Sequence, residues 1–238
     1  MIDALWTWLT QTSPAPSTPW LFLTALLAGG AVLFAPHVWS RTRLVATWIH
    51  EGGHAVMALA AGRQVTGIRL EKDTSGVTHS VGPAAGLGRV LTTFSGYPAP
   101  AVAGAGIAVC VAHGHLHWAL AGFAVVLLLL LPVQRSLRGL LVAVVLAAVI
   151  WGIAQVSAVA GSLLILLLAG YLLAAGPRTI VELHRHRQTV GPGQGDVPHS
   201  DADSLAQQTH VPALLWEAVF LAVSAGCAWL AISAVMAR

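Results

Sequence analysis

The chain has 238 residues, of which 56% are apolar and only 9% are charged, and its mean hydropathy is +0.76. Soluble domains carry about 25% charged residues, so this chain lacks the polar surface that a soluble enzyme or a disordered tail requires. The formal net charge of +3 is spread over short segments without a basic block, which argues against nucleic acid as a partner. The composition therefore predicts an integral membrane protein whose surroundings are the lipid bilayer.

Seven apolar runs approach or reach the length of roughly 20 residues that a transmembrane helix needs. They lie at about Pro19–Trp39, Leu44–Gly62, Val90–Ala112, His117–Leu131, Leu140–Gln155, Val159–Ala175 and Pro212–Met236. The expected fold class is an all-α polytopic membrane protein, a single domain of six to seven transmembrane helices. Pro98 and Pro100 beside Gly96 interrupt the third run and predict a broken helix.

Two segments are too polar to be membrane spans. Between Val65 and Val81, two stretches rich in β-branched residues flank a turn sequence at 73–76, which predicts a β-hairpin. Residues 176–211 are polar and include a Gly/Pro-rich stretch, which predicts a long loop.

The basic residues orient the expected bundle. Nine of the twelve Lys and Arg residues fall on the connections that include the hairpin and the 176–211 loop, whereas Arg41, Arg43 and Arg238 fall on the opposite side. Cytoplasmic loops of membrane proteins carry an excess of Lys and Arg. The hairpin and the long loop are therefore expected in the cytoplasm.

The second apolar run contains the sequence His50-Glu51-Gly52-Gly53-His54. On a helix, residues i and i+4 share one face, so both imidazoles can bind one Zn2+ while Glu51 acts on a water molecule beside it. The alternative is a polar helix contact in which both histidines hydrogen-bond to neighbouring side chains. A second histidine cluster, His113, His115 and His117, is read either as another metal site or as solvated residues near the membrane surface.

This motif in an apolar helix, followed by a short hairpin and the Gly/Pro-broken segment 94–100, resembles the site-2 protease family of intramembrane zinc metallopeptidases, in its divergent bacterial branch. The resemblance implies that His50 and His54 are zinc ligands and that Glu51 is the general base. It also implies a transmembrane protein or peptide as substrate and the bacterial cell membrane as location. The edge of the hairpin is a candidate for holding the substrate as an added strand. Two alternatives stay open, namely an inactive relative that binds membrane proteins, and a metal or ion transporter.

A catalytic zinc ion keeps three protein ligands, so one ligand besides the two histidines is missing. Ser200 is expected to cap a helix with Asp203 as the acid of its capping box, which leaves Asp201 free to point into the bundle. The pattern Ser-Asp-Ala before Thr-x-x-Pro-x-x-x-Trp is also similar to this branch of the family. Asp201 is therefore the expected third ligand, with Asp203 and Glu217 as alternatives.

Overall fold

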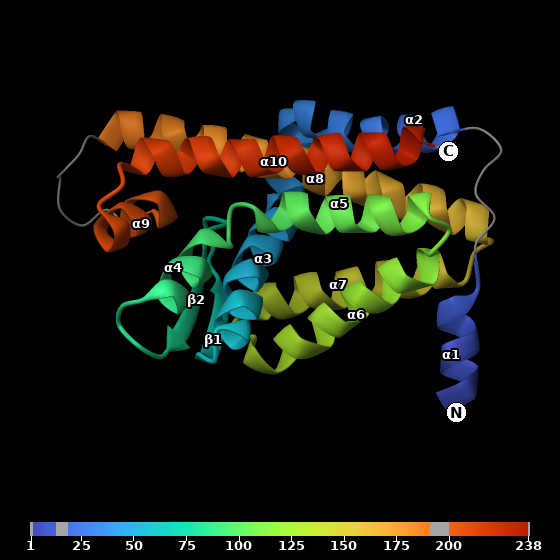
Figure 1. Ribbon diagram of the computed structural model, residues 1–238, viewed down its shortest axis with the longest axis horizontal. Coiled ribbons are helices and arrows are strands. Elements are labelled where there is room, and N and C mark those ends of the chain that lie inside the picture. The colour runs from blue at the N-terminus through green and yellow to red at the C-terminus, as the bar shows by residue number, and fades with distance from the viewer. Residues whose placement is uncertain (1, 13–18, 191–199, 238) are drawn as a thin grey trace.

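The computed structural model describes residues 2–12, 19–190 and 200–237, and most of these residues are helical (Figure 1). The elements are α1 (Ile2–Thr10), α2 (Pro19–Ala31), the 3-10 helix η1 (Val32–Phe34), α3 (Pro36–Ala60), β1 (Gln64–Leu70), β2 (Gly76–Val81), α4 (Leu87–Phe94), α5 (Ala99–Ala112), α6 (Leu116–Leu130), the 3-10 helix η2 (Leu131–Val133), α7 (Leu137–Ala154), α8 (Ala158–Val190), α9 (Asp201–Thr209) and α10 (Ala213–Met236).

Four helical segments in the described part of the chain are long and apolar enough to cross a membrane, namely α6 with η2, α7, α8 and α10. Two bent pairs of helices, α2 with α3 and α4 with α5, raise the number of candidate spans to six if each pair counts as one. The expected class, an all-α polytopic membrane protein with a small β-hairpin, is confirmed.

The boundary between the first two expected spans does not lie at residues 40–43, where the sequence placed it. The chain instead bends by 108° at Ala35, and α3 begins at Pro36 rather than near Leu44. Proline disfavours helical geometry in the residue before it, and Ala35 is extended with ψ of 110°. Pro36 itself occupies the first turn of α3, where its missing N–H does no harm. The helix that carries the histidine motif thus turns away from α2.

The third expected span is broken, as predicted. Helices α4 and α5 meet at an angle of 75°, and the break lies at residues 95–98. The hairpin is also confirmed, because β1 and β2 pair in antiparallel fashion. Its turn is closed by a hydrogen bond from the Glu71 N–H to the Ser75 carbonyl at 2.8 Å.

The expected loop over residues 176–211 is largely helical, and this prediction was wrong. Residues up to Val190 continue α8, and α9 occupies Asp201–Thr209 with Ser200 as its N-cap, while 191–199 lie outside the described residues. Contacts from elsewhere in the fold hold the polar part of α8, since Glu182 accepts a hydrogen bond from the Trp39 indole at 2.7 Å. With 33 residues, α8 is about 50 Å long, which exceeds the roughly 30 Å of a bilayer core.

Helices α2, α5, α8 and α10 run along the long axis of the molecule, and α3 crosses beneath them (Figure 1). Close packing of α2 on α8 depends on glycine, because a Cβ added at Gly170 would lie 1.8 Å from the Leu26 carbonyl oxygen. The hairpin, α4 and α9 gather at one end of the bundle, while α1 and the end of α10 lie at the other (Figure 1). Of these elements, α4 and the hairpin pack directly on α3, and α9 brings Asp201 to its histidines.

Candidate metal centre

Helix α3 presents His50 and His54 one turn apart, so that their rings meet edge to face with centroids 4.7 Å apart. The two Nε2 atoms are 3.1 Å apart. Both side chains are largely shielded from solvent, with 19% and 11% of their surface exposed. The helical spacing of the motif is thus sufficient to aim two imidazole nitrogens at one point.

The orientation of the His54 ring is fixed from α4. Its Nδ1 lies 2.7 Å from the carbonyl oxygen of Thr92. Since a carbonyl oxygen only accepts hydrogen bonds, Nδ1 carries a proton in this contact, and Nε2 is the ring nitrogen that would face a metal. Metal-binding histidines commonly donate their second ring N–H to a carbonyl in this way.

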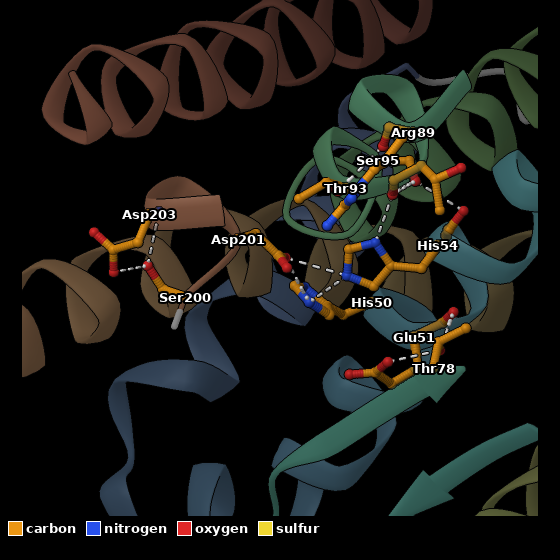
Figure 2. A network of polar contacts seen from close by, with 12 residues as sticks. His50, Glu51, His54, Thr78, Arg89, Thr93, Ser95, Ser200, Asp201 and Asp203 are labelled. Carbon is orange, nitrogen blue, oxygen red and sulfur yellow. Dashed lines mark hydrogen bonds and ion pairs between the residues drawn. The ribbon is translucent and has the colours of Figure 1, made fainter. Parts of the chain in front are cut away.

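Asp201, the first residue of α9, completes the group. Its Oδ2 lies 3.2 Å from Nε2 of His50 and 3.1 Å from Nε2 of His54, and the three ligand atoms lie within 4.8 Å of one another (Figure 2). This oxygen is buried and has no hydrogen-bond partner of good geometry among the described residues. A tetrahedral zinc ion with bonds of about 2.0–2.2 Å separates its ligand atoms by about 3.3–3.6 Å. The donor set and its spacing therefore fit a zinc ion after small adjustments.

The Asp201 carboxyl sits in an environment that favours its charged form. Burial alone would raise the pKa of this carboxyl, but the facing His54 and His50 outweigh burial and hold the pKa well below its usual range. The Asp201 carboxyl is therefore in its charged form at neutral pH, which is the form that a metal ligand requires.

The break between α4 and α5 forms a wall of the centre. Gly96 lies so close to the imidazoles that an added Cβ would be 2.3 Å from Nε2 of His54. The ring of Tyr97 meets the His50 ring edge to face at 4.7 Å and stacks on Phe220 of α10. The prolines and the glycine of this segment thus bring backbone and an aromatic ring against the histidine pair.

Glu51 lies beside the group and is directed toward the hairpin rather than toward Asp201 (Figure 2). Its side chain is 4% exposed, and its Oε2 accepts a hydrogen bond from the Thr78 hydroxyl of β2 at 2.6 Å. A Cβ at Gly76 would lie 2.6 Å from Cγ of Glu51. Any larger residue at position 76 would therefore collide with the glutamate side chain. Nothing in the sequence pattern marks Thr78, Gly76 or Thr92 for these contacts.

The other candidate ligands lie apart from this group. Asp203 is occupied in the cap of α9, where its Oδ2 accepts a hydrogen bond from the Ser200 hydroxyl at 2.6 Å. Glu217 is 3% exposed and pairs with His184 and Arg187 of α8. The histidines 113–117 form no group with metal-binding spacing in the part of the chain that the structure describes.

Comparison with known proteins assigns the chain to a family. No curated protein and no protein of solved structure matches the chain significantly. A family model described as Peptidase M50B-like matches residues 22–231, which covers the motif helix, the hairpin, the broken helix and α9. This match spans most of the described bundle, and the chain belongs to the Peptidase M50B-like family, a site-2 protease family of membrane peptidases.

Proposed function

We propose that the protein is a zinc-dependent intramembrane endopeptidase that cleaves transmembrane or membrane-proximal segments of other proteins. The observation that carries the proposal is the convergence of His50, His54 and Asp201 from two elements that are far apart in the sequence. Membership of a membrane peptidase family supports peptide bonds as the target of this centre.

In this proposal His50, His54 and Asp201 hold the metal, and Glu51 handles the proton. When bound, a zinc ion supplies Lewis acidity that polarises the scissile carbonyl and activates a water molecule. Glu51 accepts the proton of the attacking water as the new C–O bond forms, and delivers it to the amine nitrogen as the C–N bond breaks. The Thr78 hydroxyl positions the Glu51 carboxylate for both transfers.

The hairpin offers one strand edge to a substrate. The outer side of β1 is covered by the segment before α7, because the Arg135 N–H donates to the Ile68 carbonyl at 2.8 Å. The Leu70 N–H donates to the Ser136 hydroxyl at 2.9 Å on the same side. The outer edge of β2 has no backbone partner among the described residues. An extended substrate segment paired with β2 would lie on the strand that contacts Glu51.

A transporter needs buried polar side chains along a path through several helices. The described part of this chain has few buried polar side chains. The buried polar residues of the described chain are Glu51, His54, Ser162, Glu217 and Ser224. Two of them belong to the motif of α3, and Ser224 bonds to the carbonyl of its own helix. This distribution supports a single local centre rather than an ion path.

The test measures bound zinc and cleavage of a generic transmembrane peptide by the purified protein in detergent. We expect stoichiometric zinc in the wild type, zinc without cleavage in Glu51→Gln, and loss of zinc in His54→Ala and Asp201→Ala. His113→Ala, which changes an exposed histidine, is the matched control and should behave as the wild type. Cleavage at the wild-type rate by Glu51→Gln would refute the assigned base. Bound zinc with no cleavage of any transmembrane peptide by the wild type would favour a binding role instead.

A further inference from the structure

Glu217 is a buried carboxylate that the proposed chemistry does not use. It lies in the membrane-spanning helix α10 and is 3% exposed. Its Oε2 is 2.7 Å from Nδ1 of His184, and its Oε1 accepts a hydrogen bond from the Arg187 guanidinium. Both partners belong to the C-terminal part of α8, so the buried charge anchors the end of α8 on α10.

The Arg187 guanidinium has a second carboxylate partner on a third helix. Its other terminal nitrogen lies 2.9 Å from Oδ1 of Asp203, in the first turn of α9. Asp203 is itself bound to the N-cap, because Ser200 donates to its Oδ2 at 2.6 Å and accepts from its backbone N–H at 3.2 Å. A planar guanidinium suits such a bridge, because its donors form a fixed fork that can face two carboxylates.

This bridge acts on the helical turn that carries Asp201. Residues two positions apart on a helix point in nearly opposite directions, so Asp203 faces Arg187 while Asp201 faces the histidine pair. The rest of α9 is held elsewhere, through the buried Leu205 and a 3.1 Å hydrogen bond between Gln208 and Thr93 of α4. The start of α9 also packs through the fully buried Ala202. Arg187 adds a charged contact that holds the polar side of this first turn on α8.

We propose that Arg187 is a positioning residue for the metal centre. Held by the buried Glu217, it fixes the first turn of α9 through Asp203 and keeps the Asp201 carboxylate beside His50 and His54. This inference rests on the proposed function, because it assigns the group that Asp201 serves. It also gives a role to Asp203 and Glu217, the two carboxylates that the sequence analysis kept as alternative ligands.

The test measures the rate at which a chelator removes zinc from the intact protein in detergent. Arg187→Gln should speed zinc loss by about 10–100-fold, the range typical of residues that orient metal ligands. Arg187→Lys should give an intermediate rate, because an ammonium keeps the charge but not the fork. Arg185→Gln, at an exposed position on the same helix, is the matched control and should keep the wild-type rate.

Two further variants separate positioning from stability. Removing Arg187 alone leaves the buried Glu217 with His184 as its remaining partner. Arg187→Gln is therefore also combined with Glu217→Gln, which removes both charges of the ion pair. We expect this pair to stay folded and still lose zinc quickly. In an Asp203→Asn background, Arg187→Gln should add little, since the two residues act through one contact.

The outcomes distinguish this inference from the proposed function. Wild-type zinc retention in Arg187→Gln/Glu217→Gln, together with zinc loss in Asp201→Ala, would overturn the role of Arg187 and leave the zinc centre intact. Full additivity of Arg187→Gln and Asp203→Asn would also overturn it. A wild-type protein that binds no zinc would overturn the proposed function itself.

Discussion

At the scale of single residues, one hydroxyl group links the hairpin to the proposed base. Thr78 lies 2.6 Å from a carboxylate oxygen of Glu51 and 3.0 Å from its backbone carbonyl, and a hydroxyl has only one proton to donate. The contact to the carboxylate restricts the rotamer of a side chain that, in the proposed mechanism, must be aligned with the attacking water. Small misplacements of such groups are costly to catalysis.

We expect Thr78→Val, which keeps the shape and removes the hydroxyl, to lower kcat by about 10–100-fold, the range seen for supporting contacts around metal sites. Bound zinc should not change, because Thr78 contacts the base and not the ligands. Thr78→Ser should restore most of the activity. Thr66→Val is the matched control, because Thr66 lies on the same hairpin and bonds only to the His79 carbonyl. The same kcat in Thr78→Val and the wild type would contradict this role.

The residues of the centre differ in how far the sequence could predict them. His50 and His54 are four positions apart, so helical periodicity alone places them together. The contact of Glu51 with Thr78 joins residues 27 positions apart, and that of His54 with Thr92 joins residues 38 apart. Such pairs depend on how helices and strands pack, which no local pattern specifies. The capping box at Ser200 and Asp203 was readable because it is local.

At the scale of elements, the break between α4 and α5 shapes the metal centre. Gly96, Pro98 and Pro100 predict a break in the helix. They do not predict that the ends of α4 and α5 at this break face the two histidines. Because α4 turns by 75° from α5, the Thr92 carbonyl reaches His54 and Gly96 lies against both imidazoles. The sequence also did not predict that α8 extends to Val190. The polar residues of this extension have partners far away in the sequence, such as Trp39 of α3, and no local pattern indicates them.

We expect Gly96→Ala to weaken zinc binding by about tenfold or more, as loss of ligand orientation does at metal sites. The new methyl group would lie 2.3 Å from Nε2 of His54, a ring that Thr92 holds in place, so the imidazole must leave its position. Gly106→Ala on α5 is the control, because a Cβ there meets no atom within 4 Å. Zinc affinity measured by competition with a chelator checks this. Equal affinity in both variants would show that the break does not confine the ligands.

At the scale of the whole molecule, the basic residues favour one end of the bundle more strongly than the sequence alone indicated. Arg41 and Arg43 were assigned to the side opposite the hairpin and the 176–211 segment. In the structure, however, Arg43 lies 3.5 Å from Glu182 of α8, so the bend at Ala35 returns the start of α3 to the hairpin side. Helix α1 and the end of α10 lie at the end of the molecule opposite the hairpin (Figure 1).

This arrangement predicts that the hairpin faces the cytoplasm and that the α5–α6 connection faces the exterior, because Lys and Arg concentrate on cytoplasmic segments. The prediction is tested with single cysteines in a background where Cys110 and Cys227 are replaced by alanine. Lys72→Cys in the hairpin and His113→Cys in the α5–α6 connection both change exposed residues. In intact cells, an impermeant thiol reagent should label His113→Cys at once and Lys72→Cys only after permeabilisation. The reverse pattern would place the metal centre at the exterior end, and labelling of both sites in intact cells would contradict their separation across the membrane.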